Sequence, residues 1–131
     1  MITKQVSVFL ENREGRFLQI TEILKNNNIN IISFCIAETA EFGMLRMVVS
    51  DPDKAAEVLK KEEFSAHLTD VISVNIPNEE GTLFNLLKVV ADTGNNIRYM
   101  YTSLGEAGPI VLKTTNQEDV LKALKDNGFT N

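Results

Sequence analysis

The sequence predicts an α+β fold made of two tandem βαββαβ units, each an antiparallel sheet with helices on one face. The first observation behind this prediction is an internal repeat, because Val6–Phe17 and Ile72–Leu83 show one pattern at an offset of 66 residues. In both copies an alternating strand is followed by a short turn and then by an apolar-periodic helix. A duplicated unit of this size predicts a pseudo-symmetric protein.

The second observation is that polar positions repeat together with the apolar pattern. Asparagine and glycine lie three residues apart in each turn, and another asparagine follows 18 residues after the first. Duplicated polar positions suggest two equivalent binding sites. These candidate ligand-binding residues are Asn12, Gly15 and Asn30 in the first copy and Asn78, Gly81 and Asn96 in the second.

The first unit is predicted over residues 1–70. Its opening strand alternates apolar and polar residues, and its first helix carries a stripe of apolar residues at helical spacing. The second helix starts at Asp51-Pro52, where the carboxylate can cap free N–H groups and proline suits the first position. The predicted elements are strand Gln5–Leu10, helix Gly15–Asn26, strands Ile29–Ala37 and Leu45–Ser50, a helix ending near Lys61, and strand Phe64–Thr69.

The second unit is predicted over residues 71–131 and repeats this order. Asn116 is the expected cap of its last helix. Only Phe129–Asn131 remain for a fourth strand, so that strand is predicted to be short, missing or supplied by a partner. The predicted elements are strand Val71–Ile76, helix Thr82–Asp92, strands Asn96–Ser103 and Ile110–Thr114, and helix Gln117–Asp126.

Composition argues against several classes of protein. The net charge is −5 and there is no tryptophan, so no basic surface is predicted for nucleic acid. No stretch is long and apolar enough for a membrane span. The N-terminus leads directly into a strand, so we expect no signal peptide. The single Cys35 excludes an intrachain disulfide and is compatible with a reducing cytoplasm, which is the predicted location.

The repeated turns have the chemistry needed to bind a free amino acid. An asparagine amide can donate and accept hydrogen bonds, so it can hold an ammonium or a carboxylate. The start of a helix presents unpaired N–H groups to an anion, and glycine lets a ligand approach the backbone. A structural interpretation stays open, in which Asn12 and Asn78 cap helices or form turns and Gly15 and Gly81 permit close helix–sheet packing.

The segment Glu11-Asn12-Arg13-Glu14-Gly15-Arg16-Phe17, followed by Asn30-Ile31-Ile32, resembles the ACT domain, a small-molecule sensor of amino-acid metabolism. Asn78-Glu79-Glu80-Gly81-Thr82-Leu83 with Asn96-Ile97 is a looser match. The chain departs from many family members, because Glu14 and Glu80 precede the glycines where proline is common.

The resemblance implies a ferredoxin-like fold for each unit and effector sites where two ACT units lie side by side. The first turn of one unit then faces the start of the second strand in the other. If the two halves of this chain pack in that way, one site uses Asn12, Gly15 and Asn96. The other uses Asn78, Gly81 and Asn30.

The sequence contains no recognisable catalytic or metal-binding motif. His67 is the only histidine, and Cys35 lies on a predicted strand as an inert packing residue. We therefore predict no metal, no cofactor and no enzyme activity. A small ferredoxin-like enzyme would need a cavity around His67 or the pair Tyr99 and Tyr101.

The leading hypothesis is a non-catalytic regulatory protein that binds a small amino acid or related metabolite at the seam between its units. Its expected partners are a second copy of the chain, as a homodimer, and a separate amino-acid biosynthetic enzyme. Neither nucleic acid nor membrane is an expected partner. The alternative is a structural or protein-interaction module without a ligand.

Overall fold

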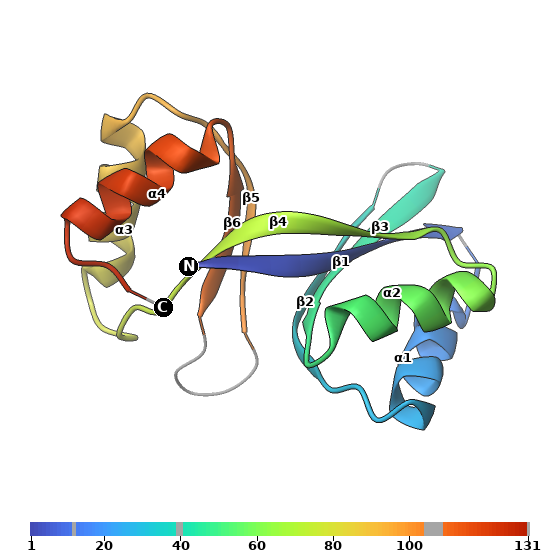
Figure 1. Ribbon diagram of the computed structural model, residues 1–131. Helices are drawn as coiled ribbons and strands as arrows, with labels where there is room; N and C mark the ends of the chain where they lie inside the picture. The colour runs from blue at the N-terminus through green and yellow to red at the C-terminus, as the bar shows by residue number, and fades with distance from the viewer. Residues whose placement is uncertain (12, 39–40, 104–108, 131) are drawn as a thin grey trace. The chain divides into compact units, whose positions relative to one another are not determined.

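The computed structural model describes residues 1–131 except 12, 39–40, 104–108 and 131. Its contacts divide the chain into two compact units. The first unit is Lys4–Asp70, and the second combines Met1–Thr3 with Val71–Asn131. Each unit has the predicted α+β architecture, with antiparallel strand pairs and helices packed against them (Figure 1).

The first unit has the strand order β2-β3-β1-β4, in which β3 pairs antiparallel with both β1 and β2. Consequently β2 lies at the edge of this unit's strand order. Between β1 and the chain leading into β4, the amide of Phe9 donates to the carbonyl of Ser65 at 3.0 Å. The elements are β1 (Ile2–Glu11), α1 (Arg16–Asn26), β2 (Ile31–Glu38), β3 (Phe42–Val49), α2 (Pro52–Lys61) and β4 (Ala66–Val74).

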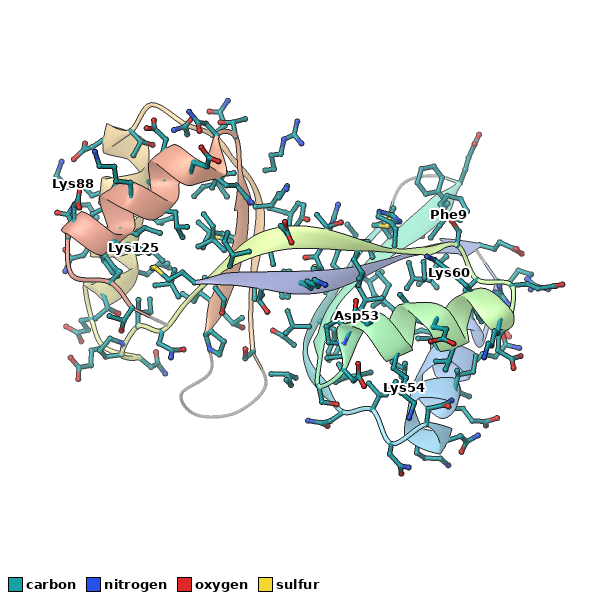
Figure 2. All side chains as sticks on the ribbon, viewed as in Figure 1. Phe9, Asp53, Lys54, Lys60, Lys88 and Lys125 are labelled. Atoms are coloured by element: carbon teal, nitrogen blue, oxygen red, sulfur yellow. The ribbon has the colours of Figure 1, made fainter. Side chains whose placement is uncertain are left out.

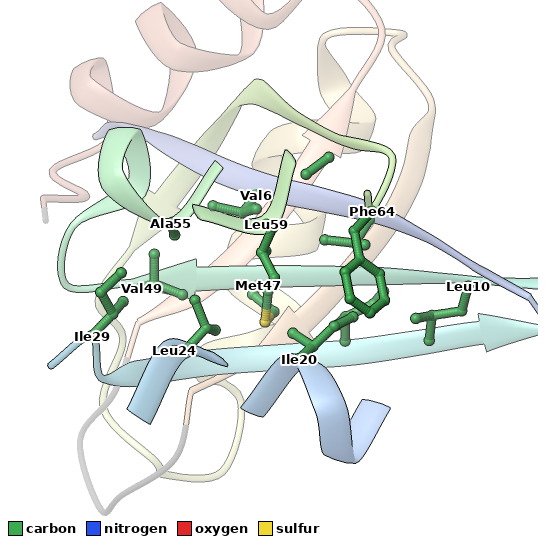
Figure 3. Close-up of a cluster of buried hydrophobic side chains, with 13 residues drawn as sticks. Val6, Leu10, Ile20, Leu24, Ile29, Met47, Val49, Ala55, Leu59 and Phe64 are labelled. Atoms are coloured by element: carbon green, nitrogen blue, oxygen red, sulfur yellow. The ribbon is translucent and has the colours of Figure 1, made fainter. Parts of the chain in front are cut away.

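The core of the first unit lies between its strands and the two helices (Figure 3). Alternate residues of β1 and β3 face the helices, because side chains along a strand point to opposite faces. The apolar stripes of α1 and α2 cover them. Fully or almost fully buried members include Val6, Val8, Leu45, Met47, Ile20, Leu24 and Leu59.

The second unit repeats this arrangement, with β6 paired antiparallel to both β4 and β5. Its helices contribute Leu86, Val90, Val120 and Leu124 to a separate core. Its remaining elements are α3 (Thr82–Asp92), β5 (Ile97–Thr102), β6 (Ile110–Thr114) and α4 (Gln117–Asp126).

A single strand, β4, replaces two strands that were predicted separately as Phe64–Thr69 and Val71–Ile76. The first half of β4 belongs to the first unit and its second half opens the second unit. Asp70 is a polar residue with ordinary strand geometry rather than a turn, so the chain continues in extended form through it. The prediction of two strands was therefore wrong.

The start of the chain runs beside β4 in the second unit, whose own fourth strand was predicted to be short, missing or supplied by a partner. The carbonyl of Met1 accepts a hydrogen bond from the amide of Ser73 at 2.6 Å, and Met1 packs against the second core. Near the C-terminus, Thr130 forms an isolated bridge with Asn75, whose amide donates to the Thr130 carbonyl at 3.0 Å. The chain's own N-terminal residues thus supply pairing along this part of β4.

The starts of α2 and α4 have the predicted side-chain caps. The Asp51 side chain accepts from the amide of Lys54 at 3.2 Å at the start of α2. The Asn116 side chain accepts from the amide of Asp119 at 3.4 Å at the start of α4. Charged side chains occupy the outer helix faces, as the labelled lysines in Figure 2 show. None of the helices in the described part of the chain has the length and apolar character required to cross a membrane.

Candidate ligand-binding site

Gly15 and Gly81 are the N-cap residues of α1 and α3 and have left-handed backbones, with φ of 79° and 85°. A Cβ at either position would meet no heavy atom within 4 Å. These glycines therefore serve the turn conformation, which side chains disfavour, and not close helix–sheet packing. Neither helix has a side-chain hydrogen bond at its cap. At the start of α3 the amide of Thr82 instead donates to the backbone carbonyl of Glu79 at 3.3 Å.

Replacing Gly15 or Gly81 with alanine is expected to lower the free energy of unfolding by about 1–2 kcal/mol, because alanine resists the left-handed conformation. Urea titration followed by circular dichroism measures this loss. Gly43→Ala is the matched control, since the added Cβ would meet only ordinary contacts at 3.7–3.8 Å. An equal loss in the control would contradict the conformational explanation.

Of the two turn asparagines, Asn12 lies outside the described residues and Asn78 is exposed. Asn78 lies three residues before the N-cap of α3, and that cap has no side-chain hydrogen bond. Asn78 is therefore not the N-cap of α3. The interpretation of Asn78 as a turn-forming residue stays a prediction.

Asn30 and Asn96 have matching backbone contacts just before β2 and β5. The amide of Asn30 donates to Ser50 Oγ at 2.9 Å, and that of Asn96 donates to Thr115 Oγ1 at 3.0 Å. Their carbonyls accept from the amides of Ser50 and Thr115 at 2.9 Å and 3.0 Å. These four bonds use only backbone atoms of the asparagines. The side-chain amides of Asn30 and Asn96 therefore extend from equivalent positions that the backbone holds in place.

Within one unit, the predicted residues lie at opposite ends of a helix. Gly15 precedes α1 and Asn30 follows it, and α1 has 11 residues. A helix of this length spans roughly 16 Å. One small amino acid therefore does not contact both Gly15 and Asn30 of a unit, and the same holds for Gly81 and Asn96. The cross-paired grouping of these residues stays a prediction.

A cavity of about 390 Å³ opens beside Gly15 at the start of α1. Its walls are formed by the end of β1, the turn before α1, the first residues of α1, the end of β2 and the start of β3. Its charged lining residues are Glu11, Arg13, Arg16 and Glu38, and its apolar ones include Phe17, Leu18 and Ile36.

Arg16 is the least exposed charged residue of this cavity, with 16% of its side chain accessible. Its guanidinium carbon lies 4.1 Å from the ring centre of Phe64, and its Nη1 donates to Gln19 Oε1 at 2.9 Å. Its buried Nε has no hydrogen-bond partner among the described residues. Arg13 is more exposed, and its Nε lies 3.1 Å from Glu11 Oε2.

Sequence reasoning did not identify Arg13 or Arg16 as site residues, although a signal was present. Arg16 is the first residue of α1, and the first turn has no acidic residue. A cation is unfavourable at the positive end of a helix dipole unless an anion lies nearby. An arginine directly after a left-handed glycine can therefore indicate an anion site.

The second unit has different chemistry at the equivalent turn. Thr82 takes the place of Arg16, and its single hydroxyl proton is shared between the carbonyls of Pro77 and Glu79, whose oxygens lie 2.6 Å and 2.9 Å from Oγ1. A cavity of about 380 Å³ nearby is lined by Thr82, Asn85 and Phe129 among others, without a charged side chain. The two turns share a backbone shape but not a charge pattern.

Of the residues considered for catalysis, Cys35 lies half-buried on β2 and His67 lies on β4. Burial raises the pKa of the Cys35 thiol, with a partly opposing effect of Arg46, so the reactive thiolate is disfavoured. His67 is exposed. In the parts of the chain that the structure describes, no three histidine, cysteine or acidic residues gather as metal ligands.

The chain thus consists of two linked sheet-and-helix units, and a left-handed glycine precedes the first helix after the turn in each. The family model described as "ACT domain pair" matches residues 1–129, and the chain belongs to this family. The family match confirms the resemblance inferred from the turn motifs. The ACT domain pair is a regulatory module.

Several solved structures share this fold. A protein from Bacteroides thetaiotaomicron is 40% identical, with a TM-score of 0.92 over 98% of this chain and 90% of that one. The regulatory subunit of aspartate kinase from Thermus thermophilus has a TM-score of 0.67 at 16% identity, covering 96% of each chain. Its counterpart from Thermus flavus has a TM-score of 0.63 at 17% identity, covering 96% of this chain and 94% of that one. The search of curated proteins gave no significant match.

Proposed function

We propose that this protein is a non-catalytic regulator that binds a small amino acid or related metabolite and acts on a separate biosynthetic enzyme. The observation that carries the proposal is membership of the ACT domain pair family over residues 1–129. The fold shared with regulatory subunits of aspartate kinase supports the same role. In this proposal the protein is cytoplasmic and forms a homodimer.

The proposed ligand contacts come from the two turns and the starts of β2 and β5. One site uses Asn12, Gly15 and Asn96, and the other uses Asn78, Gly81 and Asn30. The left-handed glycines at both turns support this assignment, because a residue without a side chain lets a ligand approach the backbone, and no side chain caps either helix start. The ligand changes the balance between two packing arrangements only by its differential affinity for them, which makes the protein allosteric.

A thermal-shift screen of the purified protein against the twenty amino acids tests this function, with nucleotides and keto acids as controls. At a hundred times its dissociation constant, a ligand adds about 2.7 kcal/mol to the free energy of unfolding. We expect one selective group of amino acids to raise the melting temperature. Asn96→Ala should weaken that effect while leaving the ligand-free melting temperature nearly unchanged. A flat response to every amino acid would overturn the sensor proposal.

A second candidate function is a protein-interaction module without a ligand. It is favoured by exposed apolar residues at equivalent positions of α1 and α3, where Leu18 is 71% exposed and Phe84 is 67% exposed. Single exposed apolar residues are common, so the repetition at equivalent positions of the two units is what favours this candidate. This function predicts that Leu18→Ser and Phe84→Ser abolish self-association, measured by light scattering, with no response to amino acids.

A further inference from the structure

We infer that the cavity of the second unit, between the start of α3 and the chain that follows α4, binds the guanidinium group of an alkylguanidinium cation (Figure 1). In the first unit, the Arg16 side chain fills the equivalent place. The cavity has a volume of about 380 Å³, and none of its described lining residues carries a charge. Asn78, Gly81 and Asn96 do not line it. This site is therefore separate from the amino-acid site proposed above.

The backbone around this cavity matches the backbone at the equivalent place of the first unit. After α2, the amide of Phe64 donates to the carbonyl of Leu59 at 3.0 Å. After α4, the amide of Phe129 donates to the carbonyl of Leu124 at the same distance, 3.0 Å. The residue before each phenylalanine has a left-handed backbone, with φ of 67° and 84°. Both units therefore hold a phenylalanine ring at the same place in the fold.

The two rings differ in what covers them. The guanidinium carbon of Arg16 lies 4.1 Å from the ring centre of Phe64, and Phe64 is only 6% exposed. In the second unit Thr82 replaces Arg16, and its short side chain is held against two backbone carbonyls of the preceding turn. Phe129 is only partly buried and lines the cavity. The cavity thus corresponds to the space that an arginine side chain occupies in the first unit.

The groups that hold the Arg16 guanidinium have counterparts in the cavity. Arg16 Nη1 donates to Gln19 Oε1 at 2.9 Å. Asn85 occupies the same position of α3 as Gln19 does of α1, since the amide of each donates to the glycine before its helix at 3.0 Å. Asn85 lines the cavity, and its side-chain oxygen can accept the same kind of hydrogen bond. Phe129 provides an aromatic face that attracts a cation.

The rest of the lining favours a planar cation. The end of α4 borders the cavity through Asn127 and Gly128, and the C-terminal end of a helix carries partial negative charge. Glu11, whose nearest oxygen lies 4.0 Å from Arg16 Nη2, is replaced by Pro77. An ammonium is strongly hydrated and would find no carboxylate among the described lining residues to replace its water. A guanidinium is more weakly hydrated and can stack on a ring while it donates hydrogen bonds at its edge.

Two-dimensional amide NMR of the full chain tests the inference, with methylguanidinium as the probe and methylammonium as the matched control. Methylguanidinium should shift the backbone amide signals of Gly128 and Phe129 and the side-chain amide signals of Asn85 until they saturate. Methylammonium at the same concentrations should leave them unchanged. Phe129→Leu should weaken binding by about threefold to thirtyfold, as expected for the loss of a cation–π contact.

Exchanging the two equivalent residues tests the correspondence between the units. Thr82→Arg places a guanidinium in the cavity from within the chain, so it should abolish the response to methylguanidinium. Arg16→Ala empties the equivalent place over Phe64 and should create a second site, seen as a new shift of the Phe64 amide signal. Phe129→Leu, which keeps the position apolar, is the second variant if an arginine exchange fails to fold.

The two possible sources of the guanidinium are distinguished by agmatine, a free alkylguanidinium, and N-acetyl-L-arginine amide, which mimics an arginine within a protein. Saturable binding of either at this cavity supports the inference. Absence of shifts around Phe129, equal shifts with methylammonium, or full binding by Thr82→Arg would overturn it. L-arginine binding without a response to methylguanidinium would also overturn it and would assign arginine to the amino-acid site. The thermal-shift response to the other amino acids tests the proposed function separately.

Discussion

Deleting Ile2 and Thr3, so that Met1 directly precedes Lys4, is expected to destabilise the second unit by about 2–4 kcal/mol. The deletion removes the hydrogen bond between Ser73 and Met1 and withdraws the Met1 side chain from the second core. The magnitude combines a hydrogen bond of about 0.5–1.5 kcal/mol with the burial of a methionine at about 1.5–3 kcal/mol.

Hydrogen exchange with mass spectrometry measures this effect separately in each unit. Peptides from β6 and the second half of β4 should exchange faster in the deletion variant. Peptides from α1 and α2 should change much less. Lys4→Ala is the control, because it removes only an exposed ion pair with Asp53 at 3.3 Å. Unchanged exchange in β6 would contradict a stabilising role for the N-terminal residues.

Leu59→Ala and Leu124→Ala are each expected to reduce the free energy of unfolding by about 2–5 kcal/mol. Both leucines are fully buried, one on α2 and one on α4, at equivalent positions of the two cores. Truncation removes buried apolar contacts and leaves a cavity that the surrounding side chains fill only partly.

Urea denaturation with two probes assigns each loss to its core. The only tyrosines, Tyr99 and Tyr101, lie on β5, so their fluorescence reports the second unit, whereas circular dichroism reports both. Leu124→Ala should lower the midpoint of the tyrosine transition. Leu18→Ala should change stability by no more than about 0.5 kcal/mol, because Leu18 is 71% exposed. A loss below 1 kcal/mol for Leu124→Ala would show that its site collapses without a cavity.

Local patterns predicted most of the fold because helices and hairpin strands depend on neighbouring residues. The alternating residues before each turn and the apolar stripes after it lie on the predicted strands and helices. The Asp51 and Asn116 caps have their predicted contacts. The helices Thr82–Asp92 and Gln117–Asp126 have their predicted ends.

Features that depend on distant parts of the chain were not predictable in the same way. Nothing around Asp70 indicates that two strands join into one. Pairing of Met1 with Ser73 joins residues far apart in the sequence, and a periodic pattern contains no information on strand partners. For the candidate site, the repeat drew attention to positions that the two units share. Arg16 was missed because it differs between the units, and its buried Nε is evident only from packing.

The sharing of β1 and β4 between the two units has a practical consequence for fragments of this protein. A fragment containing only 71–131 would lack Met1–Thr3 and would expose an unpaired edge along β4, which promotes aggregation. A synthetic peptide corresponding to the first strand should bind such a fragment and restore its solubility. Recombinant halves of this chain are therefore better prepared as complementing pairs than as isolated domains.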